Sequence, residues 1–383
     1  MGGITLYAIG LMSGTSLDGI DAALCHIEGS GIDTKVELLA FETYPLSEVL
    51  RKKIRESCFV ETCRIDQLCS LNFELGYAFS EAVSHLLDKT GFDRSKLDFI
   101  ANHGQTIFHI PFAGEKLTAS TLQLGESSII AYEHQCQVID NFRVMDMASG
   151  GQGAPLVPYS EFVLYSQKNK SIALLNIGGI GNVTWLDGSM DPSHVLAFDT
   201  GPGNMMINAS MNHLYGKPYD DGGQIGKSGH LIKEMIEELK DHPYLQLEPP
   251  KSTGREMFGE DVVLRYLEKY KDYPKEDIVH TFTYFTAYCV SEACKKYLNP
   301  LDQLIVAGGG VHNQCLMDLL SSLLDGVEVL SQEDLGYNSD AKEAIAFVVM
   351  ANETLHHQPS NMPSATGADR FVVLGKVTPI PFK

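Results

Sequence analysis

The stretch from Ile9 to Asp21 brings small hydroxyl residues, glycines and two carboxylates close together. One apolar run enters a short turn at residues 13–16 and a second leaves it after Gly19, so the pattern predicts a β-hairpin. Backbone N–H groups and hydroxyls in such a turn can bind a phosphate without a basic side chain. A carboxylate beside that phosphate, here Asp18 or Asp21, favours a metal ion held directly or through water. An ordinary hairpin, whose aspartates accept from turn amides, is the alternative interpretation.

Three further glycine-rich segments follow predicted strands, at residues 178–182, 199–204 and 308–313. Ligands of α/β folds bind at strand ends, because helix N-termini and free amides gather there. The sequence contains no Walker A motif, and no G-x-G-x-x-G joins a strand to a helix in the dinucleotide-binding arrangement. Several such loops on two matching halves predict a nucleotide held between two lobes.

The elements of the first part of the chain follow from apolar spacing and from glycine and proline positions. Apolar residues recur at helical spacing up to Lys89, and Gly91 supplies a stop signal. Asn102-His103-Gly104-Gln105-Thr106 is expected to be a polar loop after a short strand. Strands are expected in residues 4–45 and 97–101, and helices over 46–57 and 65–89.

A second pattern starts after the Gly- and Pro-rich segment 149–158, and it repeats the first. Residues 171–186 predict another hairpin around a glycine turn, and Gly179 lies 165 positions after Gly14. Strands then alternate with helices, which predicts a mainly parallel α/β core. The expected strands are 195–198 and 303–307, and the expected helices are 205–215, 230–240, 259–270, 276–297, 341–354 and one from Asn313.

The length and the repeat together predict two domains. The N-terminal lobe is expected over residues 1–145 and the C-terminal lobe over residues 146–383. The last residues, 370–383, are a candidate segment to pack back on the N-terminal lobe.

The composition excludes some partners and favours others. With 49 acidic and 29 basic residues the chain of 383 residues has a net charge of −20, which disfavours nucleic acid and anionic membranes as partners. A phosphate ligand would then depend on amides and Mg²⁺ more than on lysines. The eight cysteines show no C-x-x-C spacing, so free thiols in a reducing cytosol are expected. No basic residue precedes Lys35 and no apolar run reaches membrane length, so we expect a cytoplasmic protein without a secretory signal.

Six motifs resemble, in their order along the chain, those of the bacterial anhydro-N-acetylmuramic acid kinase family. The resemblance begins near residue 6 and continues through residues 363–368 and 373–375, so it covers nearly the whole chain. The motifs are G-L-M-S-G-T-S-L-D-G-I-D (10–21), N-H-G-Q-T (102–106), G-G-Q-G-A-P-L-V-P (150–158), N-I-G-G-I-G-N (176–182), F-D-T-G-P-G-N (198–204) and G-G-G-V-H-N (308–313).

The resemblance implies an α/β fold of the actin/Hsp70/sugar-kinase superfamily. In that fold two lobes with duplicated ribonuclease-H-like sheets enclose a central nucleotide cleft. It also implies a double reaction in cell-wall recycling, on 1,6-anhydro-N-acetylmuramic acid. Water opens the anhydro ring at C1 while the freed O6 takes the γ-phosphoryl group of ATP, which gives N-acetylmuramic acid 6-phosphate and ADP.

Phosphoryl transfer requires positioning and charge neutralisation, which glycine loops and Mg²⁺ can supply. Backbone amides of the first turn would hold the β- and γ-phosphates, and Asp18 would order Mg²⁺ through water. Gly178 and Gly179 would form the second phosphate loop, and the glycines at 308–310 would let the backbone lie against the adenosine. The expected ATP-binding residues are Gly14, Thr15, Ser16, Leu17, Asp18, Gly19, Ile20, Asp21, Gly178, Gly179, Gly308, Gly309, Gly310 and Asn313.

The hydrolytic step needs a carboxylate that takes a proton from the water attacking C1. Asp199 follows a predicted strand and matches the residue that the family uses as base, although an aspartate here could also only cap the turn. The resemblance implies His103 and Arg143 as sugar contacts, with Arg143 suited to the lactyl carboxylate. His103 as a structural histidine, and Glu343 as an exposed helix residue in place of a sugar contact, are the alternatives.

Two other functions remain as alternatives, and the resemblance implies a homodimer. Another sugar or polyol kinase of the same superfold is the nearest alternative. An Hsp70-like ATP-driven clamp is the second, but the two lobes leave no residues for a separate domain that would bind a protein substrate.

Overall fold

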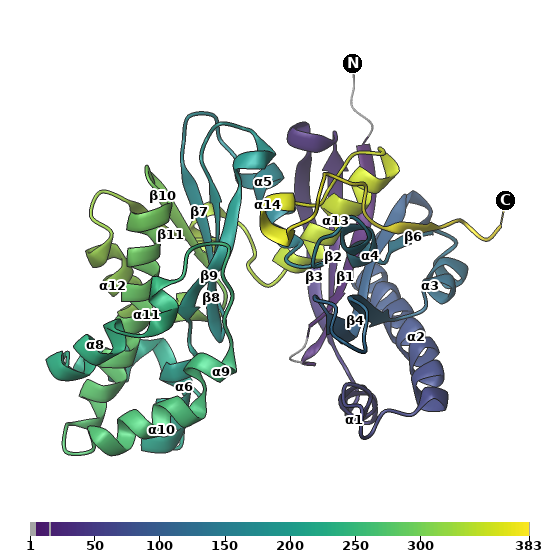
Figure 1. The fold of residues 1–383 in the computed structure, drawn as a ribbon. Helices are drawn as coiled ribbons and strands as arrows, with labels where there is room; N and C mark the ends of the chain where they lie inside the picture. Colours follow the sequence, from purple (N-terminus) through teal and green to yellow (C-terminus); the bar gives the residue numbers. More distant parts are fainter. Residues whose placement is uncertain (1–4, 15–16, 383) are drawn as a thin grey trace. The chain divides into compact units, whose positions relative to one another are not determined.

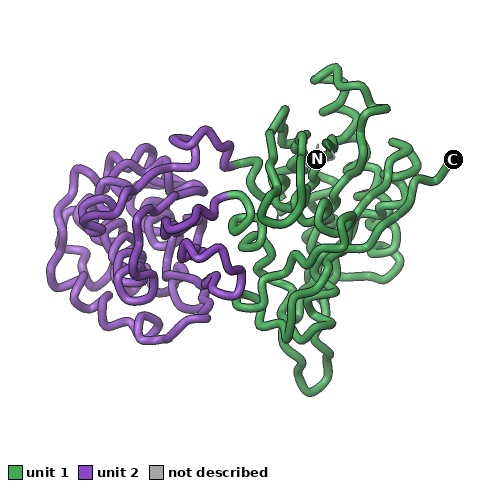
Figure 2. Tube along the Cα trace, turned by 90° about the horizontal axis from the view of Figure 1, so that it is seen from above, with its two compact units in different colours: residues 1–164, 340–383 green, residues 165–339 purple. Residues whose placement is uncertain are grey.

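The computed structural model describes residues 5–14 and 17–382, and the chain forms two compact units (Figure 1, Figure 2). Unit 1 comprises Met1–Leu164 and Asp340–Lys383, and unit 2 comprises Tyr165–Ser339. This division differs from the predicted boundary after residue 145, since residues 146–164 and everything from 340 belong to unit 1. The contacts that cause the difference join positions about 200 residues apart, as described below for Asp146.

Unit 1 is built on one mixed sheet. Within the described residues the strand order is β12-β6-β4-β1-β2-β3, with β5 paired to β4. The pairs β1–β2 and β2–β3 are antiparallel, whereas β1–β4 and β4–β6 are parallel. The strands are β1 (Thr5–Ser13), β2 (Gly19–Glu28), β3 (Lys35–Pro45), β4 (Phe99–Ile110), β5 (Ser120–Leu124), β6 (Gln137–Asp140) and β12 (Lys376–Thr378).

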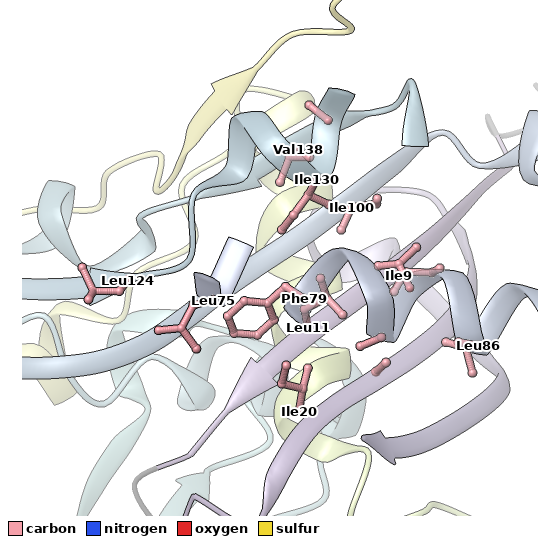
Figure 3. Packing of buried hydrophobic residues seen from close by; sticks show 14 of the residues in the cluster. Ile9, Leu11, Ile20, Leu75, Phe79, Leu86, Ile100, Leu124, Ile130 and Val138 are labelled. Carbon is pink, nitrogen blue, oxygen red and sulfur yellow. The ribbon is translucent and has the colours of Figure 1, made fainter. Parts of the chain in front are cut away.

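Helices cover this sheet on both faces. The longest, α2, buries Leu75, Phe79 and Leu86 against Ile9 and Leu11 of β1 (Figure 3). It ends at Thr90 and is capped by Gly91, whose φ of 65° lies in the left-handed region. Those burials confirm the helical spacing seen in the sequence. The helices of unit 1 are α1 (Glu48–Ser57), α2 (Ile65–Thr90), α3 (Ser127–His134), α4 (Phe142–Ala148), α5 (Val157–Tyr165), α13 (Lys342–Leu355) and α14 (Pro363–Thr366).

The helix α13 crosses β1 so closely that one residue of the strand must be glycine. A Cβ atom on Gly10 would collide with the carbonyl oxygen of Ala344 and approach Cγ2 of Val348. The close approach ties the C-terminal part of the chain to its first strand. The pairing of β12 with β6 adds a second tie, so residues 376–378 join the sheet of unit 1.

Unit 2 contains the second sheet, with the order β11-β10-β7-β8-β9 among the described residues. The helices α11 and α12 pack on it, and α6, α8 and α10 pack further out against α11. The strands are β7 (Ile172–Ile177), β8 (Ile180–Leu186), β9 (Leu196–Pro202), β10 (Gln303–Ala307) and β11 (Glu328–Ser331). The helices are α6 (Met205–Tyr215), α7 (Gln224–Ser228), α8 (Lys233–Lys240), α9 (Arg255–Phe258), α10 (Glu260–Lys269), α11 (Lys275–Tyr297) and α12 (Gln314–Leu323).

The two sheets share one topology. In each, three antiparallel strands (β1-β2-β3 and β7-β8-β9) are followed by two parallel strands beside the first (β4-β6 and β10-β11). Gly14 and Gly179 lie in the turn of the first hairpin of each unit. This confirms the duplicated ribonuclease-H-like α/β fold.

Two local expectations were wrong. Residues 102–106 are not a loop but the middle of β4, which pairs with β1, β5 and β6. Asp199 lies within β9 and not after it. In both cases pairing with distant strands extends the element past the polar residues.

None of the described helices is long and apolar enough to cross a membrane.

Candidate active site

The turn between β1 and β2 is fastened to β4 by two polar side chains. Ser13 Oγ donates to Gln105 Oε1 over 2.6 Å, and Gln105 Nε2 donates to the Gly14 carbonyl over 3.4 Å. Leu17 closes the turn with its N–H on the Gly14 carbonyl at 3.3 Å. Thr15 and Ser16, both expected to bind phosphate, lie outside the described residues. Gln105 therefore helps to hold the first turn in place.

The remaining residues of this stretch differ in what they can offer a ligand. Gly19 and Ile20 are buried in β2, and the Ile20 side chain lies in the core, so neither presents a side chain to a nucleotide. Asp18 is exposed. Asp21 is half-buried and accepts from Thr43 Oγ1 over 2.6 Å.

Several carboxylates of unit 1 influence one another near this turn. Burial, followed by the charges of Asp340 and Asp18, raises the pKa of Asp21. The pKa of Glu343, which lies in the first turn of α13, is raised by burial and by Asp21. Hard oxygen donors of this kind suit Mg²⁺, commonly with water completing the coordination. Among the described residues, no three His, Cys, Asp or Glu side chains are grouped to hold a metal ion.

The buried His103 and the half-buried Arg143 form a pair in unit 1. Arg143 Nε donates to His103 Nε2 over 3.0 Å, so the other ring nitrogen, Nδ1, carries the proton and donates to the Gly104 carbonyl at 2.9 Å. Burial and the Arg143 charge lower the pKa of His103 to about 3. The ring also packs on Phe347 of α13 with centroids 4.6 Å apart. His103 is therefore a neutral acceptor that orients the guanidinium.

The Gly-rich segment 149–158 positions Arg143 from the other side. Arg143 Nη1 donates to the Gly153 carbonyl over 2.7 Å, and the Gly153 N–H donates to Asp146 Oδ2 over 2.8 Å. Asp146 is fully buried, and its Oδ1 accepts from Asn361 and Thr366. This segment thus supports Arg143 inside unit 1, whereas the sequence pattern placed it in the C-terminal lobe.

A polar pocket of about 210 Å³ adjoins His103 in unit 1. Its lining includes Asn102, Ser127 at the start of α3 and Asp140 at the end of β6. Burial raises the pKa of Asp140, which a hydrogen bond from Ser127 opposes. The pocket combines amide, hydroxyl and carboxyl groups, which can recognise a hydroxylated, uncharged ligand.

In unit 2 the glycine turn between β7 and β8 is joined to the end of β9. The N–H groups of Gly203 and Asn204 donate to the carbonyls of Gly179 and Gly178, at 2.9 and 2.8 Å. A Cβ on Gly203 would collide with the Gly178 carbonyl oxygen, so glycine is required there. The predicted phosphate loop and the 199–204 motif therefore form one structure.

Close packing requires glycine at 308 and 310, whereas Gly309 between them is exposed. Gly308 has a φ of 79°, and a Cβ there would lie 2.7 Å from Asn176 Oδ1. A Cβ on Gly310 would collide with the Ile177 side chain. Gly309 is exposed, and a Cβ there would meet only Asn204 within 4 Å among the described residues. Asn313 is buried and caps α12, accepting from the Leu316 N–H at 3.0 Å. Its side chain is therefore already engaged within the protein.

Asp199 is half-buried on β9. Its Oδ2 accepts from the Thr253 N–H over 2.9 Å, and no other protein group among the described residues bonds the carboxylate. Burial raises the pKa of Asp199, and the Thr253 bond opposes that rise. A carboxylate with a raised pKa and one free oxygen is suited to accept a proton from water.

The residues around Asp199 could not be picked out from the sequence. Tyr244, Lys251 and Thr253 all bond to Asp199, and they come from the segment between α8 and α9. The paired prolines at 249–250, followed by Lys-Ser-Thr-Gly, indicate a constrained loop, but nothing in them indicates that the loop contacts Asp199.

Sequence comparisons with known proteins cover nearly the whole chain. The family model described as Anhydro-N-acetylmuramic acid kinase matches residues 6–380. The protein named anhydro-N-acetylmuramic acid kinase from Clostridioides difficile (strain 630) is 51% identical over 98% of this chain and 99% of its own length. That from Bacillus cereus (strain Q1) is 48% identical over 97% and 99%. A solved structure of the activator of the 2-hydroxyisocaproyl-CoA dehydratase from Clostridium difficile aligns with a TM-score of 0.43 at 12% identity, over 90% of this chain and 94% of that one.

Proposed function

The chain belongs to the anhydro-N-acetylmuramic acid kinase family, and we propose which of its residues carry out the reaction. The protein is an ATP-dependent phosphotransferase of peptidoglycan recycling. It opens 1,6-anhydro-N-acetylmuramic acid with water and phosphorylates O6, giving N-acetylmuramic acid 6-phosphate and ADP.

Asp199 is the proposed general base. Its free carboxylate oxygen takes a proton from the water whose oxygen bonds to C1 of the sugar. The C1–O6 bond breaks, O6 bonds to the γ-phosphorus, and the bond from that phosphorus to the β–γ bridging oxygen breaks to release ADP. The observation that best supports this role is that Oδ1 of Asp199 has no protein partner among the described residues, while burial raises the pKa of the carboxylate.

Arg143 is the proposed direct contact of the sugar, and His103, whose two ring nitrogens already have protein partners, is proposed to act on the sugar by orienting Arg143. The guanidinium has five N–H donors, and the described contacts use one on Nε and one on Nη1. The remaining donors can bind the lactyl carboxylate as a fork. Glu343 is proposed as a further sugar contact, because its exposed carboxylate at the start of α13 can accept hydrogen bonds from hydroxyl groups.

The proposed nucleotide contacts are mostly backbone groups. In unit 1 these are the amides of Gly14, Thr15 and Ser16, with the rest of the stretch to Asp21 as their frame. In unit 2 the turn at Gly178 and Gly179 is proposed to contact phosphate. The exposed backbone of Gly309, with Gly308, Gly310 and Asn313 shaping it, is proposed to contact the adenosine.

Mg²⁺, a homodimer and a cytoplasmic location are proposals that follow from family membership. Asp18 is the exposed carboxylate next to the first turn, and its oxygens would bind the ion through water. The ion would neutralise charge on the transferring phosphoryl group. The large negative charge of the chain supports a role for Mg²⁺ over lysines.

Isotope-labelled turnover tests this assignment. The purified protein is incubated in ¹⁸O-water with ATP, Mg²⁺ and the anhydro sugar, and the product is analysed by mass spectrometry and ³¹P NMR. The expected product carries one ¹⁸O at C1 and a phosphate on O6. ATP consumption with a different sugar or polyol, and none with the anhydro sugar, would assign the protein to another kinase activity. ATP consumption stimulated only by a protein would favour the clamp.

A further inference from the structure

We infer that the segment from Tyr244 to Thr253 is a positioning element that fixes the Asp199 carboxylate for proton transfer. The inference rests on the proposed role of Asp199 as the base. Three hydrogen bonds join this one segment to this one residue. Tyr244 Oη donates to the Asp199 carbonyl over 2.6 Å. The Asp199 N–H donates to the Lys251 carbonyl over 3.0 Å, and the Thr253 N–H donates to Asp199 Oδ2 over 2.9 Å.

The position of Asp199 on an edge strand explains why such a segment is needed. β9 is the last strand in the order β11-β10-β7-β8-β9, so its outer edge has no strand partner within the described residues. Unpaired backbone groups of an edge strand are open to water or to other chains. The 244–253 segment occupies this edge at Asp199, bonding both its N–H and its C=O. The main chain beneath the carboxylate is therefore held on both sides.

The segment is itself anchored in the core of unit 2. Tyr244 has no exposed surface, and its ring meets Phe258 edge-on with centroids 5.7 Å apart. The Lys251 ammonium lies 4.7 Å from the centre of the Tyr244 ring and 5.7 Å from that of Tyr297. Burial, and then the Asp199 charge, raise the pKa of Tyr244, so its hydroxyl remains a donor. The bond to Asp199 is therefore supported by packing.

The contacts divide the two oxygens of the carboxylate into different roles. The Thr253 amide holds Oδ2 and stabilises the ionised form, while Oδ1 is left to accept from the attacking water. The groups around Asp199 that carry charge or titrate are Tyr244, Lys251 and, against Gly201 on the same strand, Cys289. If the hydrogen bond from the Thr253 N–H were lost, burial would act unopposed and the pKa of Asp199 would rise further. The carboxylate would also become free to rotate away from the water.

The variant Tyr244→Phe tests the inference with the smallest change of shape. It removes the bond to the Asp199 carbonyl and keeps the buried ring. We expect kcat to fall about 10-fold or more, within the range for a general base that loses its alignment. KM for ATP and the acidic limb of the kcat/KM profile are expected to stay unchanged, because the Thr253 amide still bonds Oδ2. The control is Tyr266→Phe, which removes a hydroxyl from a half-buried ring of the same core with no contact to Asp199.

A second variant acts on the carboxylate directly. Thr253→Pro removes the N–H that bonds Oδ2, so it is expected to lower kcat and to move the acidic limb of the kcat/KM profile to higher pH, because burial then raises the pKa of Asp199 unopposed. Unchanged kcat in folded Tyr244→Phe protein, or an unchanged acidic limb in folded Thr253→Pro protein, would overturn the inference. Asp199→Asn distinguishes this from failure of the proposed base. If that variant retains turnover, the base assignment is wrong; if it is inactive while the other two behave like the wild type, only the positioning role is wrong.

Discussion

The Nε2 atom of His103 accepts a hydrogen bond from Nε of Arg143, although histidine is commonly a donor to charged groups. The arrangement holds only while the ring is neutral, and the low pKa of about 3 keeps it neutral at physiological pH. The neutral ring therefore helps to hold the guanidinium in place, and the contacts on Nε and Nη1 leave further N–H donors for a ligand.

Replacing Arg143 by lysine should weaken sugar binding and leave ATP binding unchanged. Lysine lacks the planar fork and cannot bond His103, Gly153 and a carboxylate at once. We expect KM for the anhydro sugar to rise about 10-fold or more, as for loss of a hydrogen bond to a charged group. Steady-state kinetics with each substrate varied in turn will measure this. Arg265→Lys, at an exposed position on α10, is the matched control. An equal rise in both KM values would argue against a specific sugar contact.

Asp199→Asn should remove the base and preserve the structure. The Thr253 N–H can still donate to the amide oxygen of asparagine, so we expect the melting temperature and the Kd for ATP to change little. Turnover should fall by at least about 100-fold, the usual scale for loss of a general base. Coupled measurement of ADP release, together with calorimetric titration of ATP, checks both parts. Turnover near that of the wild type would exclude Asp199 as the base.

Gly10→Ala should destabilise unit 1. The added methyl group would collide with the Ala344 carbonyl, so β1 and α13 would have to separate. Overpacking of this kind costs about 1–3 kcal/mol, and thermal melting monitored by circular dichroism should show the loss. Gly114→Ala is the control, because a Cβ there meets nothing within 4 Å. Equal melting temperatures of the two variants would contradict the close approach.

The stability of unit 1 should fall on acidification because of His134. Burial lowers the pKa of His134 to about 4 from 6.5, and its Nδ1 is buried without a partner. Between these values the unfolded chain binds more protons, so stability falls as the pH decreases. The slope from this group is about 1.4 kcal/mol per pH unit. Melting temperatures from pH 7 to pH 5 should fall less steeply in His134→Leu than in the wild type. The exposed control His230→Gln should keep the wild-type slope, and parallel slopes for all three proteins would refute the assignment.

Features that depend on neighbouring residues could be predicted from the sequence. The helical spacing of Leu75, Phe79 and Leu86 identified α2, and glycines between two apolar runs identified the first hairpin of each unit. The repeat at Gly14 and Gly179 then indicated the duplication. These signals lie within single elements, where apolar spacing and turn chemistry decide the structure.

Features that depend on distant pairing could not be predicted. Residues 102–106 are polar, yet β1, β5 and β6 pair with them and make them strand. The bonds from Asp146 to Asn361 and Thr366 span 215 and 220 positions, and they place the 149–158 segment in unit 1. Tyr244 and Thr253 reach Asp199 across 45 and 54 positions. No local pattern encodes which of many polar residues become partners.

Unit 1 is assembled from two stretches of chain, with unit 2 between them in the sequence. During synthesis the ribosome therefore releases all of unit 2 before α13 and β12 exist to complete the first sheet. Unit 2 is continuous and can fold as soon as it emerges, whereas β1 and β6 wait with a face and an edge uncovered. Until those elements are made, the uncovered face of β1 and edge of β6 are open to aggregation, and a chain truncated after residue 339 would keep them uncovered.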